Sequence, residues 1–556
     1  MPIISKEIYA GVRYMKYNPS KRAVAVYCGF LMCLCFLCAR LYRLSEGNRS
    51  LDVLGGQYSR KLDVAQRSAF VYDRNMQLIS HKPDGYIILT DPAALEGSVN
   101  SLCAQLSDVS DKDADGLSDR LLSGKTLLIT ADGSADVSEL SEKKGMYVFP
   151  KYAETDGIAV HLMGYKNSDG IGMSGLQKEY TGILSELSGN VSAVYQANAV
   201  NAVMTDGGFT VCDKGYTTRD GVVLTIDKEL QEFCDNLGKE YIDCGAVVVC
   251  DVKTGEILAC SSFPEYDQKR VGDYLNSDRA ELVNRVEKTF TPGSVFKLVV
   301  AAAALEQSKD NFDFEYTCTG SIEVGGETFR CHKKSGHGAQ TLSDAFANSC
   351  NTYFVALGRK IGMEQIVKTA RNMGLGQPVF ADILSADAAN LPDNTDSDEK
   401  LLANISFGQG TLLVSPLDMI NVTNVCATGF LPTLSAVKGI YSGQMLKQPQ
   451  KNEPVRVLSD ETVAKMKTMM RKCVTDGTGN GAFIKSVPNG GKTATAQTGQ
   501  RLSDGSEILH RWFCGVYPLE DPKYSVCVLC DGNGRTRISP AEIFKIVNKF
   551  LINRKF

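Results

Sequence analysis

A serine and a lysine three residues apart stand at the start of a long apolar stretch. Residues 291–297 read TPGSVFK and are followed directly by LVVAAAAL. The Pro-Gly pair predicts a turn, after which Ser294 opens an apolar helix with Lys297 one turn later on the same face. A lysine amine that such a helix desolvates can stay neutral and accept the proton of a serine hydroxyl. We therefore predict a serine nucleophile, Ser294, beside its base, Lys297.

A second segment, 55 residues further on, adds a hydroxyl and an amide. Residues 347–354 read ANSCNTYF. Ser349 could relay a proton and Asn351 could bind a peptide amide. Such a pair is common in sequences, so it gains meaning only from its partners.

A third segment reads as a strand of small residues with one cation and two hydroxyls. Residues 490–497 are GGKTATAQ, with Lys492, Thr493 and Thr495 as the polar members. This combination suits the binding of a carboxylate beside an extended peptide.

In this order the three segments resemble the S-x-x-K, S-x-N and K-T-G motifs of penicillin-binding proteins and serine β-lactamases. The third departs from the family, because Ala494 stands where glycine is usual and its methyl would narrow the space for a ligand. The literal K-T-G at residues 253–255 precedes the nucleophile and lies between two strand-like segments. We interpret it as a hairpin turn.

The N-terminal half carries further family features. Residues 67–79, RSAFVYDRNMQLI, are similar to the start of the non-catalytic domain of class B penicillin-binding proteins, and residues 161–165 and 172–180 to its second half. Residues 91–152 alternate acidic loops with short helices and are interpreted as an insertion. Three charged residues are interpreted as a salt-bridged hinge: Arg67, Asp73 and Arg74.

The resemblance implies a D,D-transpeptidase that cross-links peptidoglycan stem peptides through a serine acyl-enzyme and is inhibited by β-lactams. The implied catalytic residues are Ser294, Lys297, Ser349 and Lys492, the substrate-binding residues are Asn351, Thr493 and Thr495, and the oxyanion is held by the backbone N–H groups of Ser294 and Thr495. No metal or organic cofactor is expected. The implied partners are stem peptides, β-lactams, the membrane and a polytopic glycan polymerase.

The implied fold class is α+β, with a single N-terminal transmembrane helix, an elongated pedestal or dimerisation domain, and a transpeptidase domain whose antiparallel sheet is flanked by helices, as in serine β-lactamases. The expected boundaries are a cytoplasmic tail at 1–22, an anchor at 23–43, the pedestal at 44–217 and the transpeptidase domain at 218–556. From residue 221 the pattern predicts a strand at 222–227, an amphipathic helix at 228–241 and a hairpin at 245–261.

Residues 23–39 are uncharged and would span roughly 25 Å as a helix, which can cross a bilayer if Arg40 and Arg43 snorkel. Five lysines and arginines precede this run against one acid, Glu7. The positive-inside rule then predicts a single-pass cell-membrane protein with a cytoplasmic N-terminus and an extracytoplasmic catalytic domain. A cleaved signal peptide is the alternative, but no small-x-small site follows the run.

The 556 residues are enough for two or three domains, and a net charge of −4 argues against a nucleic-acid partner. Most of the 18 cysteines are interpreted as small buried residues. The best candidates for a disulfide are Cys318 and Cys331, which flank a predicted hairpin turn. His332 and His337 lie in a loop without a nearby carboxylate, so metal binding is not expected there.

Two alternatives share these motifs. A D,D-carboxypeptidase or β-lactamase would transfer the acyl group to water, although the pedestal and the anchor speak against it. A catalytically impaired cell-wall scaffold is the non-enzymatic alternative, and Ala494 is the feature that supports it.

Overall fold

The structure is a computed structural model that describes residues 19–46, 58–155, 157–393, 398–450, 452–501, 505–532 and 534–554. The predicted cytoplasmic tail therefore lies outside the described residues as far as residue 18. Helix α1 spans Pro19–Glu46 and contains the predicted anchor. Within the described ranges, no helix satisfies both the length and the apolarity required to span a membrane.

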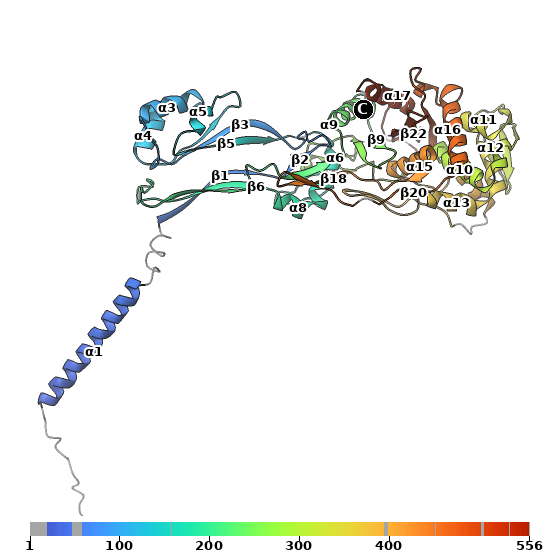
Figure 1. Cartoon of the computed structure of the whole chain (residues 1–556). Coiled ribbons are helices and arrows are strands. Elements are labelled where there is room, and N and C mark those ends of the chain that lie inside the picture. Colours follow the sequence, from blue (N-terminus) through green and yellow to red (C-terminus); the bar gives the residue numbers. More distant parts are fainter. Residues whose placement is uncertain are drawn as a thin grey trace, which may run out of the picture.

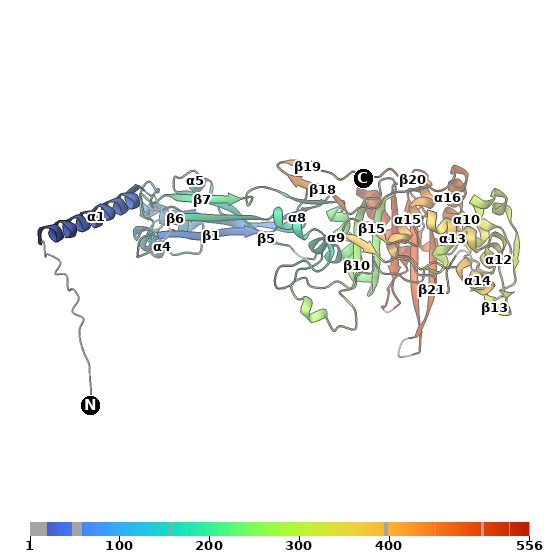
Figure 2. The same ribbon diagram turned by 90° about the horizontal axis from the view of Figure 1, so that it is seen from below.

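The N-terminal half is built on two three-stranded antiparallel sheets that run lengthwise along a narrow part of the molecule (Figures 1 and 2). One sheet contains β1 (Ser59–Arg67), β6 (Gly189–Gln196) and β7 (Phe209–Lys214), and the other contains β4 (Leu128–Ala131), β3 (His81–Thr90) and β5 (Met146–Glu154). Val64 and Val191 of the first sheet share a hydrophobic cluster with Leu89 and Phe149 of the second. This cluster joins the two sheets.

The segment predicted to be an insertion adds three helices over the second sheet. They are α3 (Val99–Asp108), α4 (Ala114–Leu122) and α5 (Ser138–Ser141), and they bury a small core of their own around Ile88 and Leu106. Three short helices follow: α6 (Val160–Met163), α7 (Gly175–Glu179) and α8 (Thr181–Glu186).

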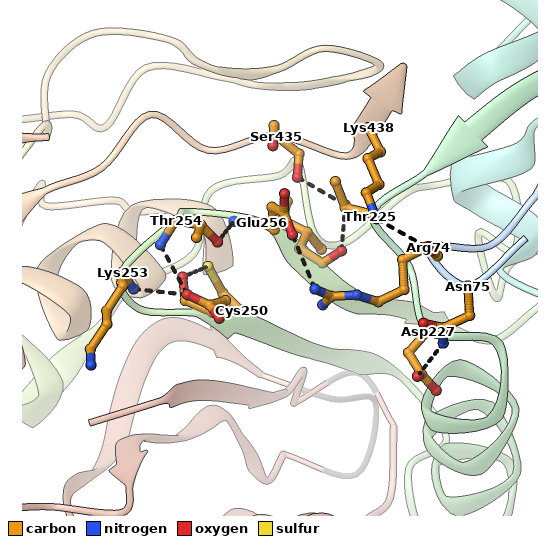
Figure 3. Close-up of polar contacts among 12 residues, drawn as sticks. Arg74, Asn75, Thr225, Asp227, Cys250, Lys253, Thr254, Glu256, Ser435 and Lys438 are labelled. Carbon is orange, nitrogen blue, oxygen red and sulfur yellow. Dashed lines mark hydrogen bonds and ion pairs between the residues drawn. The ribbon is translucent and has the colours of Figure 1, made fainter. Parts of the chain in front are cut away.

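The two halves of the chain share a four-stranded sheet. Its strands are, in order, β19 (Met445–Lys447), β18 (Val437–Ser442), β8 (Gly221–Leu224) and β2 (Phe70–Tyr72), with β2 parallel to β8. Beside it, Arg74 forms an ion pair with Glu256 at 3.3 Å, and the Lys438 amine donates a hydrogen bond to the Arg74 carbonyl at 3.1 Å (Figure 3).

The predicted salt-bridged hinge is correct for Arg74 and wrong for Arg67 and Asp73. The Arg67 guanidinium donates to the backbone carbonyls of Gly215 and Thr218, each at 2.7 Å. The Asp73 carboxylate accepts from the backbone N–H of Asn75 at 2.8 Å. Both side chains therefore satisfy backbone groups of turns, which sequence spacing alone does not reveal.

The C-terminal half is organised around a five-stranded antiparallel sheet, as expected. Its strands are, in order, β10 (Ile257–Phe263), β9 (Gly245–Asp251), β23 (Tyr524–Cys530), β22 (Glu507–Tyr517) and β21 (Gly490–Arg501). Alternate residues of β9 enter different cores: Val247 packs in one hydrophobic cluster and Val248 in another. Because both faces are covered, the strands are almost continuously apolar.

Helices cover the two faces of this sheet. Helices α9 (Lys228–Tyr241) and α17 (Pro540–Arg554) cover one face, while α15 (Pro416–Thr428), α16 (Asp460–Thr475) and α10 (Lys297–Gln307) belong to the core on the other. Helix α9 has the predicted bounds, because Asp227 caps its N-terminus by accepting from the Leu230 N–H at 3.0 Å.

The remaining elements lie beside these helices. The helices are α11 (Leu342–Ala347), α12 (Asn351–Ile361), α13 (Met363–Asn372) and α14 (Glu399–Ser406), with 3-10 turns η1 (Val271–Tyr274), η2 (Gly293–Phe296), η3 (Lys309–Asp313) and η4 (Asn480–Ala482). The short strands are β11 (Tyr316–Cys318), β12 (Ser321–Val324), β13 (Glu327–Arg330), β14 (Gly338–Gln340), β15 (Val379–Ala381), β16 (Leu384–Ala386), β17 (Phe430–Leu431) and β20 (Val455–Arg456).

Candidate active site

Ser294 lies in a tight turn and not at the start of the α-helix itself. Gly293–Phe296 form the 3-10 turn η2, and the α-helix α10 begins at Lys297. The α-helix thus begins three residues later than predicted. In a 3-10 turn the side chains at i and i+3 eclipse each other, so this correction keeps Ser294 and Lys297 on one side of the chain.

The turn is wedged between β21 and the segment after α14. Gly293 has a φ of 56°, and a methyl on it would come within 2.9 Å of the Ala496 side chain of β21. The Gly293 N–H donates to the Gly408 carbonyl at 2.9 Å. Gly408 also has a positive φ, and a methyl there would lie 1.9 Å from the Gly293 carbonyl. Only glycines allow this close approach, which fixes the nucleophile beside the strand.

The Lys297 side chain is completely buried and reaches the second segment. Its Nζ lies 2.9 Å from the Ser349 carbonyl oxygen, 3.2 Å from the Ser349 hydroxyl and 2.8 Å from the Asn351 amide oxygen. Burial, followed by the positive charge of Lys492, lowers the pKa of Lys297 well below its ordinary value. Desolvation favours the neutral amine, while the three acceptors can hold the ammonium, so the group is suited to taking and releasing a proton.

Ser349 and Asn351 are held by a sharp bend between two helices. Ser349 has a φ of 55° and lies between the end of α11 and Asn351, the first residue of α12. The left-handed conformation is uncommon for a serine and is typical of functional sites. The bend turns both the Ser349 carbonyl and its hydroxyl toward Lys297.

Strand β21 supplies the third segment. Lys492 is completely buried, and its amine donates to the Thr493 carbonyl at 3.0 Å. Burial lowers the pKa of Lys492. Ala494 is only 6% exposed and belongs to the same core cluster as Trp512. It is therefore mostly covered by protein, and it also lines a pocket.

A pocket of about 440 Å³ is lined by residues of all three segments. Six predicted residues line it: Ser294, Ser349, Asn351, Thr493, Ala494 and Thr495. The structure thus brings the predicted site residues together, because the buried Lys297 contacts Ser349 and Asn351 and the buried Lys492 precedes and contacts Thr493. Their individual roles stay predictions.

The literal K-T-G lies in a different place and forms the predicted hairpin turn (Figure 3). The turn joins β9 to β10, and the backbone N–H groups of Lys253 and Thr254 donate to the Asp251 carboxylate at 3.0 and 2.9 Å. The Lys253 amine forms an ion pair with Asp521 at 2.8 Å. These contacts explain why residues 253–255 form a turn.

The pocket also contains residues that were not predicted, among them Thr478, Arg511 and His332. The Thr478 hydroxyl lies 2.7 Å from the Thr493 hydroxyl, and Arg511 is the cross-strand neighbour of Thr495. His332 lines the same pocket. Arg511 could have been found by pairing β21 with β22 across their turn, whereas Thr478 and His332 come from loops without a periodic signal.

The cysteines agree with the interpretation as small buried residues at the two positions that were the best candidates for a disulfide. Cys318 and Cys331 are buried free thiols, and the hairpin between β12 and β13 is present. Both sulfur atoms lie with those of Cys350 and a His337 ring nitrogen in one group whose chemistry suits a metal ion. The ligand atoms close to His337 are thiols, which a criterion based on carboxylates near the histidines overlooks.

Comparisons with known proteins find similar sequences and structures. Residues 245–549 match the family described as penicillin binding protein transpeptidase domain. Stage V sporulation protein D of Bacillus subtilis is 31% identical over 70% of this chain and 61% of its own length. Peptidoglycan D,D-transpeptidase MrdA of Acinetobacter baumannii is 25% identical over 87% of this chain and 80% of its own length.

Among solved structures, a chain of a peptidoglycan synthase complex that coordinates polymerization and crosslinking superposes with a TM-score of 0.67. It covers 96% of this chain and 97% of its own length at 21% identity. This likeness shows the fold.

We predict that acylation of Ser294 depends on neutral Lys297. As the pH falls through the lowered pKa of Lys297, the amine gains a proton and the rate drops, so this acid limb lies well below the ordinary lysine value of 10.5. Stopped-flow acylation by a chromogenic β-lactam across pH measures it. Lys297→Ala should slow the reaction by about 10²- to 10⁴-fold and remove the limb.

The control is Lys360→Ala, which removes an exposed lysine on α12. It should keep both the rate and the pH profile. An unchanged rate and profile in Lys297→Ala would exclude this lysine as the base.

Proposed function

The chain belongs to the penicillin-binding protein transpeptidase family, and we propose that it is a peptidoglycan D,D-transpeptidase that acts through an acyl-enzyme on Ser294. One observation carries the proposal. The buried Lys297 amine contacts both Ser349 and Asn351, which line the same pocket as Ser294. A nucleophile, a desolvated base and a hydroxyl relay are thereby available at one point.

In the proposed first step, Lys297 accepts the hydroxyl proton while the Ser294 oxygen attacks the carbonyl carbon of the penultimate D-alanine. The C–N bond to the terminal D-alanine breaks, and Ser349 with Lys492 delivers a proton to the leaving amine. The backbone N–H groups of Ser294 and Thr495 hold the oxyanion. An amine of a second stem peptide then attacks the ester, which forms the cross-link and restores the serine.

Substrate binding is assigned to the pocket walls. Asn351 orients the peptide amide, and Thr493 with Thr495 binds the terminal carboxylate. Two contacts support this assignment: Thr478 fixes the Thr493 hydroxyl at 2.7 Å, and Arg511 adds a positive charge across the strand from Thr495. A β-lactam resembles the D-alanyl-D-alanine end and would acylate the same serine.

We also propose that α1 attaches the protein to the cell membrane, with the N-terminus cytoplasmic and the catalytic half outside. The helix has 28 residues, and several of its large apolar side chains are more than two-thirds exposed, among them Val26, Phe30, Met32 and Phe36. Apolar surface of this extent on one helix needs a cover, and lipid supplies it.

The proposed partner is a polytopic glycan polymerase, which would supply strands for cross-linking. The solved relative in a peptidoglycan synthase complex supports this choice, because that complex coordinates polymerization with crosslinking.

Turnover tests the enzymatic proposal. The full chain in detergent, given a stem-peptide donor that ends in D-alanyl-D-alanine and a stem-peptide amine acceptor, should release D-alanine and form a cross-linked product seen by mass spectrometry. Ser294→Ala should abolish both. Ser435→Ala, which changes the serine of another S-x-x-K at residues 435–438, should retain them. Release of D-alanine without a cross-link would indicate a hydrolase, and no turnover by folded protein would favour a scaffold.

Fractionation tests the anchor. Full-length protein in bacterial cells should stay in the membrane pellet after a carbonate wash, and protease added to spheroplasts should digest its catalytic half. A chain without residues 1–46 should be recovered in the soluble fraction. Release of the full-length protein by carbonate would contradict an inserted anchor.

A further inference from the structure

Three cysteines and one histidine converge beside the active site. They come from four places: Cys318 ends β11, Cys331 follows β13, His337 precedes β14 and Cys350 precedes α12. Their ligand atoms all lie within 4.8 Å of one another. The three cysteines are buried, and the histidine is partly buried.

The spacing of these atoms fits the corners of a zinc site. Zinc binds sulfur at about 2.3 Å and imidazole nitrogen at about 2.0–2.1 Å in a tetrahedron, so neighbouring ligand atoms lie roughly 3.6–3.8 Å apart. His337 Nδ1 lies 3.7 Å from the Cys318 sulfur and 3.4 Å from the Cys331 sulfur. The Cys331 and Cys350 sulfur atoms are 4.0 Å apart.

The His337 ring is directed at two of the sulfur atoms. A thiolate and a neutral imidazole are the forms that bind zinc, and both residue types are present in this group. Cysteines that merely fill a core would not need an imidazole aimed at their sulfur atoms.

We propose that Cys318, Cys331, His337 and Cys350 bind one Zn²⁺ in a closed tetrahedral site, and that this ion fixes the segment carrying Ser349 and Asn351. Three thiolates and one imidazole leave no open position for water, so the ion is structural. Soft thiolate ligands select zinc over magnesium or calcium.

The second part of the proposal follows from the position of Cys350. This residue lies between Ser349 and Asn351, the two residues that contact the Lys297 amine. The Asn351 side chain also donates to the carbonyl of Arg330, next to Cys331, at 3.3 Å. An ion that joins Cys331 to Cys350 would therefore hold the wall of the pocket against the base. The four ligands are positioning residues, and this part rests on the proposed function.

Metal analysis tests the site directly. The full chain, purified under reducing conditions without chelator, should contain about one zinc ion per molecule by plasma mass spectrometry and by native mass. Cys331→Ser and His337→Ala should lose it. Cys426→Ala, a buried cysteine on α15 outside the cluster, should keep it. The proposal would be overturned if the purified protein contained no zinc and took up none from zinc chloride. It would also be overturned if active protein purified under reducing conditions contained a Cys331–Cys350 disulfide.

Removal and return of zinc test the positioning part in the wild type, which avoids variants that fail to fold. A strong chelator should lower the melting temperature and slow β-lactam acylation by about 10- to 100-fold, the loss typical when a metal site loses a partner. Zinc chloride should restore both. Acylation at an unchanged rate in the zinc-free protein would overturn the positioning part. A protein that binds zinc but is never acylated by a β-lactam would support the zinc site and contradict the proposed function.

Discussion

Burying an amine costs free energy unless it forms hydrogen bonds, and the completely buried Lys297 amine has three hydrogen-bond acceptors around it. Two of these acceptors belong to Ser349 and one to Asn351. The apolar helix α10 that buries the lysine therefore determines where the bend before α12 must lie. The position of Ser294 is tied to the same point, because Lys297 comes directly after the turn that carries Ser294.

The fold supports this arrangement with small residues and with two-sided burial. Gly293 and Gly408 let the nucleophile turn approach β21 and the segment after α14. The five-stranded sheet is covered on both faces, and β21 joins one of the two cores through Ala494. Ala494 takes part in one of them, which explains how a methyl is accepted where the family has glycine.

Local signals were enough for much of the fold and the site. Helix α9 has the predicted bounds because an amphipathic pattern and the Asp227 cap coincide. The literal K-T-G was correctly assigned to a turn, since its flanking segments pair with each other. The conformation around Ser294 was less predictable, because a 3-10 turn and the first turn of an α-helix share the same residue preferences.

The failures came from contacts between distant segments. Cys318 and Cys331 flank a hairpin and suggest a disulfide, but only the fold reveals that His337 and Cys350 complete a group of four. Arg67 and Asp73 were predicted to belong to a salt-bridged hinge with Arg74, whereas in the structure they bind backbone groups of turns. Sequence spacing records charges and thiols, whereas their partners depend on tertiary packing.

The most direct test of the account is the intact mass of the protein after incubation with a penicillin. Wild type should gain the mass of one penicilloyl group, located on Ser294 by peptide mapping, and Ser294→Ala should gain none. A folded wild-type protein that stays unmodified, or an adduct that persists in Ser294→Ala, would contradict the assignment of this serine as the nucleophile.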